Sequence, residues 1–450
     1  MACEVQRRQR RAAVTGTSPG LGGVWPLAPR WASCLLMISF PGSAEQGARI
    51  VRLRPSPNPA PPEQRCRGAS VMPAPLKNPS HHRDGFFRPV GSSPRRGAFC
   101  GMAWVFFAVL LGDGVWNAMR HACDDRAACG QFILAGSIRP TYTITDHSGA
   151  GRVARLRLRP MSLYESGDST GRISLSGLLA GGPCRADPPE SDLLRVSELV
   201  CRGGFPRFTA LEPADAGARL GDYLRDVAMV DLRGGEVTHD PLKMLALITS
   251  LARNEGTSAS ARTLIADSAN TGGPSDRDTV RRYLDRLEEA FVVEPLPAWA
   301  THLRSSTTLR STPKRYFADP SLAAAALRAS PAGLRADLAA LGLLFESLAL
   351  RDLRVYAQAA RAEVRYYLDS KNLEADAIIT RGAGDWAAVE IKLGGADAVA
   401  SAVESLRRVR SRVDTQQAGE PSRLIVLTAA GRAFETVDDI AVVPVTLLGP

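Results

Sequence analysis

Two neighbouring segments near the C-terminus alternate apolar and charged residues with a period of two, which is the pattern of β-strands. In the first, EADAII at 374–379, Asp376 shares a face with the glutamate two residues before it. In the second, WAAVEIKLG at 386–394, Glu390 and Lys392 share a face, and the apolar residues beside them face the other way. Strands flanked by helices are normally covered on both faces and apolar throughout, so these charges are costly unless they have a function.

The hydrophobic periodicity around these two strands predicts a longer run of elements. In chain order they are a helix at about 333–353, strands at 362–369, 374–380 and 386–392, a helix at about 396–411 and an apolar strand at 423–428. The C-terminal region is therefore expected to have the order α-β-β-β-α-β, with Glu346 on its first helix.

Asp376 is followed, after 13 intervening residues, by Glu390-Ile-Lys392. This spacing resembles the D…ExK pattern of metal-dependent nucleases with a restriction-endonuclease-like fold. The resemblance implies that Asp376 and Glu390 hold Mg²⁺ on a phosphodiester, with Glu346 as a third metal-binding carboxylate. It implies that Lys392 orients the attacking water. Taken singly, Glu346 is equally a solvated helix residue, and Glu390 with Lys392 an exposed ion pair, so these simpler interpretations stay open.

From about 241 the pattern predicts three helices, PLKMLALITSLA, ASARTLIADSA and SDRDTVRRYLDRLEEA. Ser275, with Asp278 three residues later, has the form of a capping box at the start of the third helix. FVVEPLPAW at 291–299 and PKRYFAD at 313–319 predict the two strands of a hairpin. Three helices followed by a hairpin are the elements of a winged-helix module.

A winged helix suggests DNA binding through its third helix. Four arginines are expected to face outward from that helix: Arg277, Arg281, Arg282 and Arg286. Acidic residues are interleaved with them and cancel much of their charge. A packing module between neighbouring domains is therefore the alternative interpretation.

The positive charge of the chain is concentrated in its first hundred residues. The 450 residues carry a formal net charge of +10, but residues 1–100 hold 15 basic and 4 acidic residues, and the others hold 41 and 42. Net charge is therefore poor evidence that the folded part binds nucleic acid. Residues 1–100 also hold 14 of the 31 prolines and no sustained periodicity, so they are predicted to be a disordered basic extension.

The compartment is predicted from apolar runs and cysteines. The runs at 31–40 and 102–111 are too short to span a bilayer. The eight cysteines all lie at or before Cys201 and contain no CxxC pair. We therefore expect a cytoplasmic protein in a reducing environment, with no membrane association.

Strand-like segments at 103–111 and 131–137, joined by a short helical segment at 115–125, predict a parallel α/β sheet. Three segments resemble the second half of the AAA-type ATPase in bacterial and archaeal proteins that carry the domain of unknown function 4143: GQFILAGSIRP (130–140), HSGAGRVARLRLRPMSLYESG (147–167) and SELVCRGGFPRF (197–208). Such an ATPase needs GxxxxGK[ST], whose backbone N–H groups hold the phosphates. No such string occurs in the sequence, so the chain is expected neither to bind nor to hydrolyse ATP.

The chain also resembles the 4143 domain itself, from about residue 220 to 394. The segments that carry this resemblance are the third helix, the PLPAW turn, PKRYFADPSLAAAAL, GLLFESLALRDL and the EADAII…VEIK pair. The resemblance implies a helical and winged portion followed by a nuclease-like fold. It implies the same candidate site, formed by Glu346, Asp376, Glu390 and Lys392.

Together these features predict an α/β multidomain protein. The expected parts are the extension at 1–100, a partial AAA-like parallel sheet at 101–205, a helical and winged-helix module at 206–320 and a restriction-endonuclease-like domain at 321–450. The expected function is Mg²⁺-dependent hydrolysis of a nucleic-acid phosphodiester, with DNA as the partner. Two alternatives stay open: a non-catalytic DNA-binding or scaffold protein, and an ATP-binding family member whose ATP site is lost.

Overall fold

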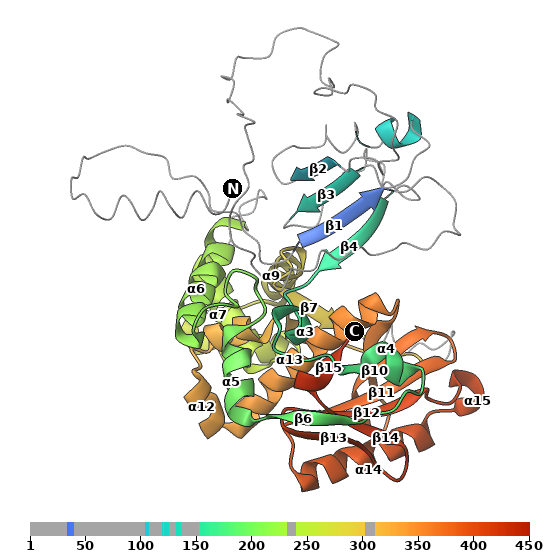
Figure 1. Ribbon diagram of the computed structural model, residues 1–450. Coiled ribbons are helices and arrows are strands. Elements are labelled where there is room, and N and C mark those ends of the chain that lie inside the picture. Colours follow the sequence, from blue (N-terminus) through green and yellow to red (C-terminus); the bar gives the residue numbers. More distant parts are fainter. Residues whose placement is uncertain are drawn as a thin grey trace, which may run out of the picture.

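The computed structural model describes residues 34–39, 104–107, 119, 121–125, 132–136, 153–231, 240–301 and 311–450 (Figure 1). Most of the predicted extension at 1–100 lies outside these ranges, as does the loop of the predicted hairpin at 302–310. The described residues form a mixed α/β protein. None of its helices in these ranges is long and apolar enough to cross a membrane.

A small sheet precedes the helical part of the chain, with strand order β2-β3-β1-β4. Its strands are β1 (Cys34–Ser39), β2 (Trp104–Phe107), β3 (Phe132–Gly136) and β4 (Val153–Leu158). β2 and β3 are parallel, as the sequence predicts, but β1 pairs antiparallel with both β3 and β4. The sheet is therefore mixed rather than parallel.

Strand β1 corrects the prediction that residues 1–100 lack regular structure. It is formed by the apolar run at 31–40, which is too short to span a bilayer. A short apolar run is equally suited to a strand that pairs on both edges, and length alone decides against the bilayer. The prediction was therefore wrong for Cys34–Ser39.

The chain between residues 163 and 336 is mainly helical. The α-helices among its described residues are α3 (Leu163–Ser166), α4 (Leu175–Leu179), α5 (Leu193–Arg202), α6 (Pro213–Asp226), α7 (Pro241–Arg253), α8 (Ala261–Ser268), α9 (Arg277–Glu289), α11 (Pro320–Ala326) and α12 (Pro331–Ala336). After α9, strands β7 (Val293–Leu296) and β8 (Lys314–Phe317) pair antiparallel. The three helices and the two-stranded hairpin predicted from 241 to 319 are thus all present.

Helix α9 shows how the sequence sets its local structure. Its apolar stripe is buried, including Val280, Tyr283 and Leu287. Its N-cap is Asp276, whose side chain accepts a hydrogen bond from the backbone N–H of Thr279. The predicted cap, one residue earlier, was wrong, because aspartate caps as well as serine and Asp276 is the extended residue immediately before the helix.

A seven-stranded sheet forms the C-terminal part, in the order β6-β13-β14-β12-β11-β10-β9. Its strands are β6 (Ala186–Ser191), β9 (Glu363–Leu368), β10 (Glu374–Gly382), β11 (Asp385–Lys392), β12 (Arg423–Thr428), β13 (Gly431–Glu435) and β14 (Ile440–Pro444). The helices beside it are α13 (Leu338–Ala359), α14 (Ala396–Arg412) and the short α15 (Thr415–Ala418). The run α13-β9-β10-β11-α14-β12 confirms the predicted element order.

The two long helices cover opposite faces of this sheet. Val389 of β11 packs in the same apolar cluster as Leu344 of α13, whereas Ala388, the next residue along the strand, packs with Leu406 of α14. β9, β10 and β11 pair antiparallel, and β11, β12 and β14 pair parallel, so the sheet is mixed.

Two early strands complete the C-terminal part (Figure 1). β6 pairs with β13, and β5 (Ile173–Ser174) pairs with β15 (Leu448–Gly449). One cluster of buried apolar side chains extends from Leu163 to Leu448 and therefore crosses the predicted domain limits at 206 and 321.

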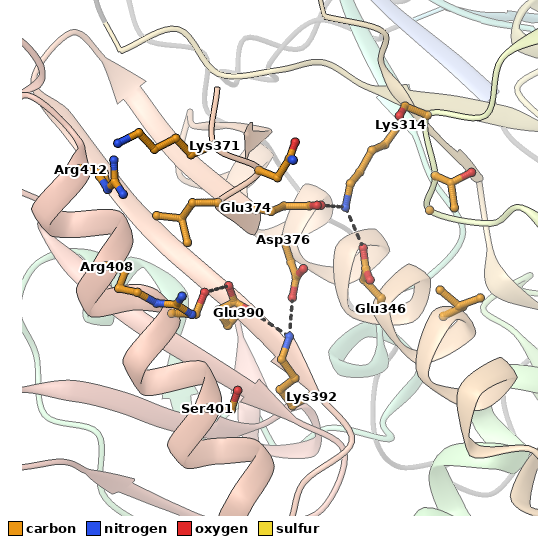
Figure 2. A pocket seen from close by; sticks show the side chains of 17 residues that line it. Lys314, Glu346, Lys371, Glu374, Asp376, Glu390, Lys392, Ser401, Arg408 and Arg412 are labelled. Atoms are coloured by element: carbon orange, nitrogen blue, oxygen red, sulfur yellow. Dashed lines mark hydrogen bonds and ion pairs between the residues drawn. The ribbon is translucent and has the colours of Figure 1, made fainter. Parts of the chain in front are cut away.

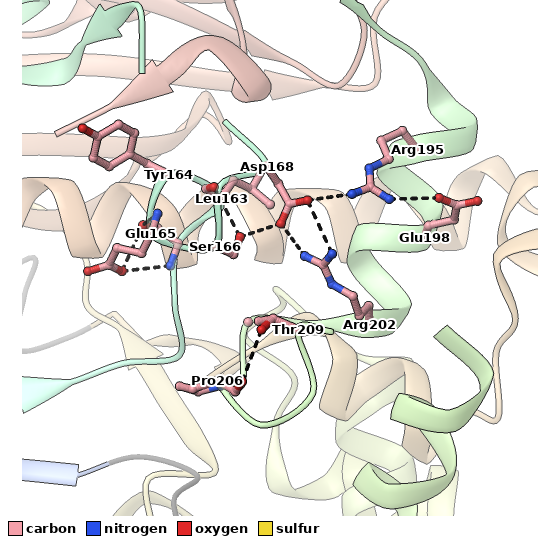
Figure 3. Close-up of polar contacts among 12 residues, drawn as sticks. Leu163, Tyr164, Glu165, Ser166, Asp168, Arg195, Glu198, Arg202, Pro206 and Thr209 are labelled. Carbon is pink, nitrogen blue, oxygen red and sulfur yellow. Dashed lines mark hydrogen bonds and ion pairs between the residues drawn. The ribbon is translucent and has the colours of Figure 1, made fainter. Parts of the chain in front are cut away.

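Asp168 joins the turn after α3 to helix α5 (Figure 3). Its carboxylate accepts hydrogen bonds from Ser166 Oγ at 2.6 Å, from Arg195 Nη2 at 2.6 Å and from the Arg202 guanidinium. Burial raises the pKa of Asp168, but the hydrogen bonds from Arg202 and Ser166 outweigh it and lower the pKa. The carboxylate is therefore ionised at neutral pH and holds α3 against α5.

Candidate functional site

A cleft of about 720 Å³ opens where β10 begins and β11 ends, between α13 and α14. Figure 2 shows the side chains that line it. Most come from α13, β10, β11 and α14, and Lys314 reaches it from β8. The four residues predicted from the D…ExK pattern and the preceding helix all line this cleft: Glu346, Asp376, Glu390 and Lys392.

Asp376 is positioned by an irregularity in β10. The pairing of β10 with β9 shifts register between Ala375 and Ile378, which frees the strand from a regular ladder at this point. Asp376 Oδ2 instead accepts a hydrogen bond from the backbone N–H of Ile391 at 2.7 Å and lies 3.3 Å from Lys392 Nζ. The carboxylate thus lies against the end of β11.

Glu390 is almost fully buried, with 4% of its surface exposed. Ser405 of α14 donates a hydrogen bond to its Oε1 at 2.9 Å, and Lys392 Nζ donates to its Oε2 at 2.7 Å. Burial and the nearby Asp376 raise the pKa of Glu390 to about 7, although Lys392 opposes the shift. The single ammonium group of Lys392 therefore bridges Asp376 and Glu390.

Glu346 faces the cleft from α13. Its Oε1 accepts a hydrogen bond from the Tyr316 hydroxyl at 2.5 Å and lies 3.6 Å from Lys314 Nζ. Burial and the charge of Asp376 raise the pKa of Glu346 to about 7 against the opposing effect of Lys314. Glu346 and Glu390, two of the three predicted metal-binding carboxylates, thus both have a pKa raised to about 7.

Lys314 and Glu374 also belong to the site, but they were not predicted from the sequence. Lys314 pairs with Glu374 as well as with Glu346 (Figure 2). Burial alone would lower the pKa of Lys314, but the surrounding carboxylates together have the larger, opposite effect and raise it. The side chain therefore stays charged. Glu374 could have been found from its place on the same face as Asp376. Lys314 could not, because it reaches the cleft from a hairpin far earlier in the chain.

The mouth of the cleft is basic. Lys371, Arg408 and Arg412 line it and are exposed, whereas the carboxylates lie deeper (Figure 2). Arg408 and Arg412 are one helical turn apart on α14 and so face the same way. A buried acidic floor under a basic rim suits a ligand with an anionic backbone and a bound cation.

The predicted nucleic-acid residues of α9 lie elsewhere. Arg277, Arg281, Arg282 and Arg286 are all exposed and none lines the cleft. Arg286 pairs with Glu289 at 3.3 Å, and Arg282 donates to the Thr279 hydroxyl at 2.9 Å. The helix is therefore an exposed surface of mixed charge, and its contact with DNA stays a prediction.

A divalent cation would have two carboxylates available in this cleft. Throughout the described residues, no three His, Cys, Asp or Glu side chains are arranged to hold a metal ion. Asp376 and Glu390, however, both lie within 3.3 Å of the same ammonium nitrogen. Mg²⁺ is usually bound through one or two carboxylates, with water and substrate phosphate completing its shell. The donor set therefore fits Mg²⁺ without a third protein ligand, provided that Lys392 yields its position between the two acids.

A fully buried acid, Glu255, lies behind the cleft. It accepts hydrogen bonds from Ser347 Oγ at 2.6 Å and from the Phe317 N–H at 3.0 Å. Burial nevertheless raises its pKa from 4.5 to about 8. The folded protein thus keeps a proton that the unfolded chain releases, so this carboxyl stabilises the fold below about pH 4.5 and loses its effect as the pH rises towards 8.

Substituting Glu255→Gln is expected to remove this pH dependence. Between about pH 6 and about pH 7.5, the wild type should lose about 2 kcal/mol more unfolding free energy than the variant, because each pH unit in this range costs about 1.4 kcal/mol. Urea denaturation across the range measures the difference, with the exposed Glu363→Gln as control. Parallel stability curves for wild type and Glu255→Gln would show that Glu255 is ionised throughout.

Two family models match the chain. Residues 194–333 match domain of unknown function DUF8612, and residues 341–448 match domain of unknown function DUF4143. The DUF4143 match contains all four predicted site residues. The stretch in which the sequence resembles the 4143 domain, about 220–394, is thus divided between two family models.

Similar proteins come from mycobacteria. Uncharacterized proteins of Mycobacterium tuberculosis and Mycobacterium bovis are each 27% identical to the chain over 217 residues. The match covers 46% of this chain and 40% of each relative, so the chain spans less than half the length of these curated relatives. No solved structure matches the chain.

Proposed function

We propose that the cleft hydrolyses a phosphodiester bond of nucleic acid with the aid of a divalent cation such as Mg²⁺. One observation carries the proposal: Asp376 and Glu390 converge on Lys392 in a cleft whose mouth is basic. Carboxylates that face each other in a buried cleft repel, and the raised pKa of Glu390 is typical of sites that bind a cation or move protons.

Each residue has a role in this proposal. Asp376 and Glu390 would hold the cation, and Glu346 would assist through a bound water. The cation would supply charge stabilisation on the phosphate. With the cation held by Asp376 and Glu390, Lys392 would orient the attacking water or contact the phosphate. Lys371, Arg408 and Arg412 would hold neighbouring phosphates of the strand.

The element order supports this proposal. Asp376, Glu390 and Lys392 lie at one end of the sheet, which is what a restriction-endonuclease-like fold would require. The three helices α7, α8 and α9 with the hairpin β7–β8 would then be a winged-helix module. In this arrangement the arginines of α9 would contact duplex phosphates while the cleft cuts the strand.

A non-catalytic role is favoured by the ion pairs of the cleft. Lys314 and Lys392 neutralise two of its four carboxylates, which is also what a structural ion-pair network would do. In that case the cleft would join the helical part to the sheet, and the basic rim and α9 would bind DNA or a partner chain.

The test of the proposal is a cleavage assay with the full chain. Supercoiled plasmid and branched DNA are incubated with Mg²⁺ or Mn²⁺, and parallel reactions contain a chelator. We expect nicking with either metal and none with the chelator, because the two carboxylates need a cation to act on a phosphate. A folded protein that cuts neither substrate with either metal would contradict the nuclease proposal and leave the binding role.

A further inference from the structure

A second pocket, of about 500 Å³, lies at the C-terminal end of α13. Its walls come from β4, β7, the last turn of α13 and the start of β9. The charged residues that line it are five arginines, Arg155, Arg157, Arg159, Arg354 and Arg361, and two acids, Glu294 and Glu363. The lining therefore carries a net charge of +3, in contrast to the acidic floor of the cleft described above.

One carboxylate in this pocket contacts three guanidinium groups. Glu294 accepts two hydrogen bonds from Arg159, at 3.1 and 2.8 Å, and lies 3.4 Å from Arg157 and 3.5 Å from Arg354. All four side chains are at most 19% exposed. Burial raises the pKa of Glu294, but Arg354, Arg159 and Arg157 lower it to about 2, so the carboxylate is fully ionised. Arg159 and Arg354 thus place two largely buried guanidinium groups beside this one carboxylate, an arrangement that a further anion would stabilise.

Arg361 adds a further guanidinium group to the pocket. It follows the end of α13 with a φ of 57°, in the left-handed region that favours glycine. The hydrogen bond from Ala362 N to Ala357 O, at 2.8 Å, closes the helix in this conformation. The Arg361 side chain is exposed and lines the pocket. Arg361 thus adds an exposed positive charge to the pocket.

We propose that this pocket binds a phosphate group. Planar guanidinium groups from two elements can each donate two parallel hydrogen bonds to a phosphate, which makes arginine suited to this recognition. The volume admits a phosphate together with part of the group that carries it. The phosphate belongs either to a small phosphorylated molecule or to the backbone of a nucleic acid. The site does not depend on the nuclease proposal, because its residues are not those of the acidic cleft.

The test uses the full chain in the presence of a chelator, so that no metal contributes to binding. Inorganic pyrophosphate is titrated at constant ionic strength by calorimetry, and a labelled single-stranded oligonucleotide by fluorescence anisotropy. We expect saturable binding of one or both probes. Pyrophosphate alone would identify a small phosphorylated ligand, whereas the oligonucleotide with weak pyrophosphate binding would identify a nucleic-acid backbone.

Arg361→Gly is the informative variant. It removes one guanidinium and relieves the left-handed backbone, so it should weaken binding about tenfold while melting at or above the wild-type temperature. Arg361→Gln removes the charge without changing the backbone preference and should weaken binding equally. A role confined to the fold would instead change only the melting temperature.

Arg328→Gly is the matched control. Arg328 is exposed, follows helix α11 with a φ of 53° and has the same closing hydrogen bond, from Ala329 N to Ala324 O at 2.8 Å, but it lies outside the pocket. It should bind both probes as the wild type does. Absence of binding by the wild type, or equal affinity of wild type, Arg361→Gly and Arg361→Gln, would overturn the proposal.

Discussion

Replacing Asp376 with asparagine is expected to lower Mg²⁺-dependent cleavage of DNA by about 10²–10³-fold, a loss typical of removing one preorganised charge from an active site. Asparagine keeps the size of the side chain and can still accept the hydrogen bond that Ile391 N–H donates to Asp376 Oδ2. It removes the negative charge that would hold the cation and that attracts Lys392. The initial rate of plasmid nicking at fixed Mg²⁺ concentration measures the loss.

Asp385→Asn is the control for this substitution. Asp385 lies at the other end of the β10–β11 pair and forms a partly exposed ion pair with Arg381 at 2.7 Å. The same carboxyl-to-amide change there should leave the rate within about twofold, because a surface ion pair contributes little. Equal rates for wild type and Asp376→Asn would remove Asp376 from the mechanism. Equal losses in both variants would show that the assay reports on folding.

Replacing Arg351 with methionine is expected to lower the unfolding free energy by about 3–5 kcal/mol, because it leaves two buried carboxylates without their counter-charge. Arg351 is 2% exposed and donates to Asp319 at 2.8 Å and to Asp352 at 2.9 and 2.7 Å. The same carboxylates accept hydrogen bonds from the backbone N–H groups of Gly204 and Leu163. The guanidinium therefore joins α13 to the start of α11, and the Asp352 carboxylate that it neutralises joins α13 to the start of α3.

Urea denaturation at neutral pH measures this loss. The control is Arg225→Met, since Arg225 forms an ion pair with Asp222 within one helix and both side chains are more than half exposed. That change should cost less than about 0.5 kcal/mol. If Arg351→Met is as stable as the wild type, the buried ion pairs are not needed to hold these elements together.

The sequence was most informative where chemistry and local pattern coincide. The charged residues of β10 and β11 interrupt an otherwise buried pattern, and the strands lie next to each other in the chain, so Asp376, Glu390 and Lys392 were bound to meet. Glu346 joins them because the preceding helix packs on the same three strands. Proximity along the chain therefore predicted that these four residues line one cleft, while their part in catalysis stays a prediction.

Contacts between segments far apart in the chain could not be predicted from the sequence. Lys314 meets Glu346 and Glu374 only after the hairpin has packed against α13. Arg159 meets Glu294 across 135 positions of the chain, and no periodicity within either segment encodes that meeting. Strand β13 was not predicted either, because its short, half-exposed run lacks a clear alternation.

The pairing of β6 with β13 determines how this protein can be divided for experiments. A fragment that began after residue 205 would retain β13 with one edge unpaired, since β6 would be missing. It would also lose β5 and with it the partner of β15. Open strand edges are sites of self-association, so such a piece would aggregate more readily than the parent. Crystallisation and activity work on a shortened form should therefore keep both β5 and β6.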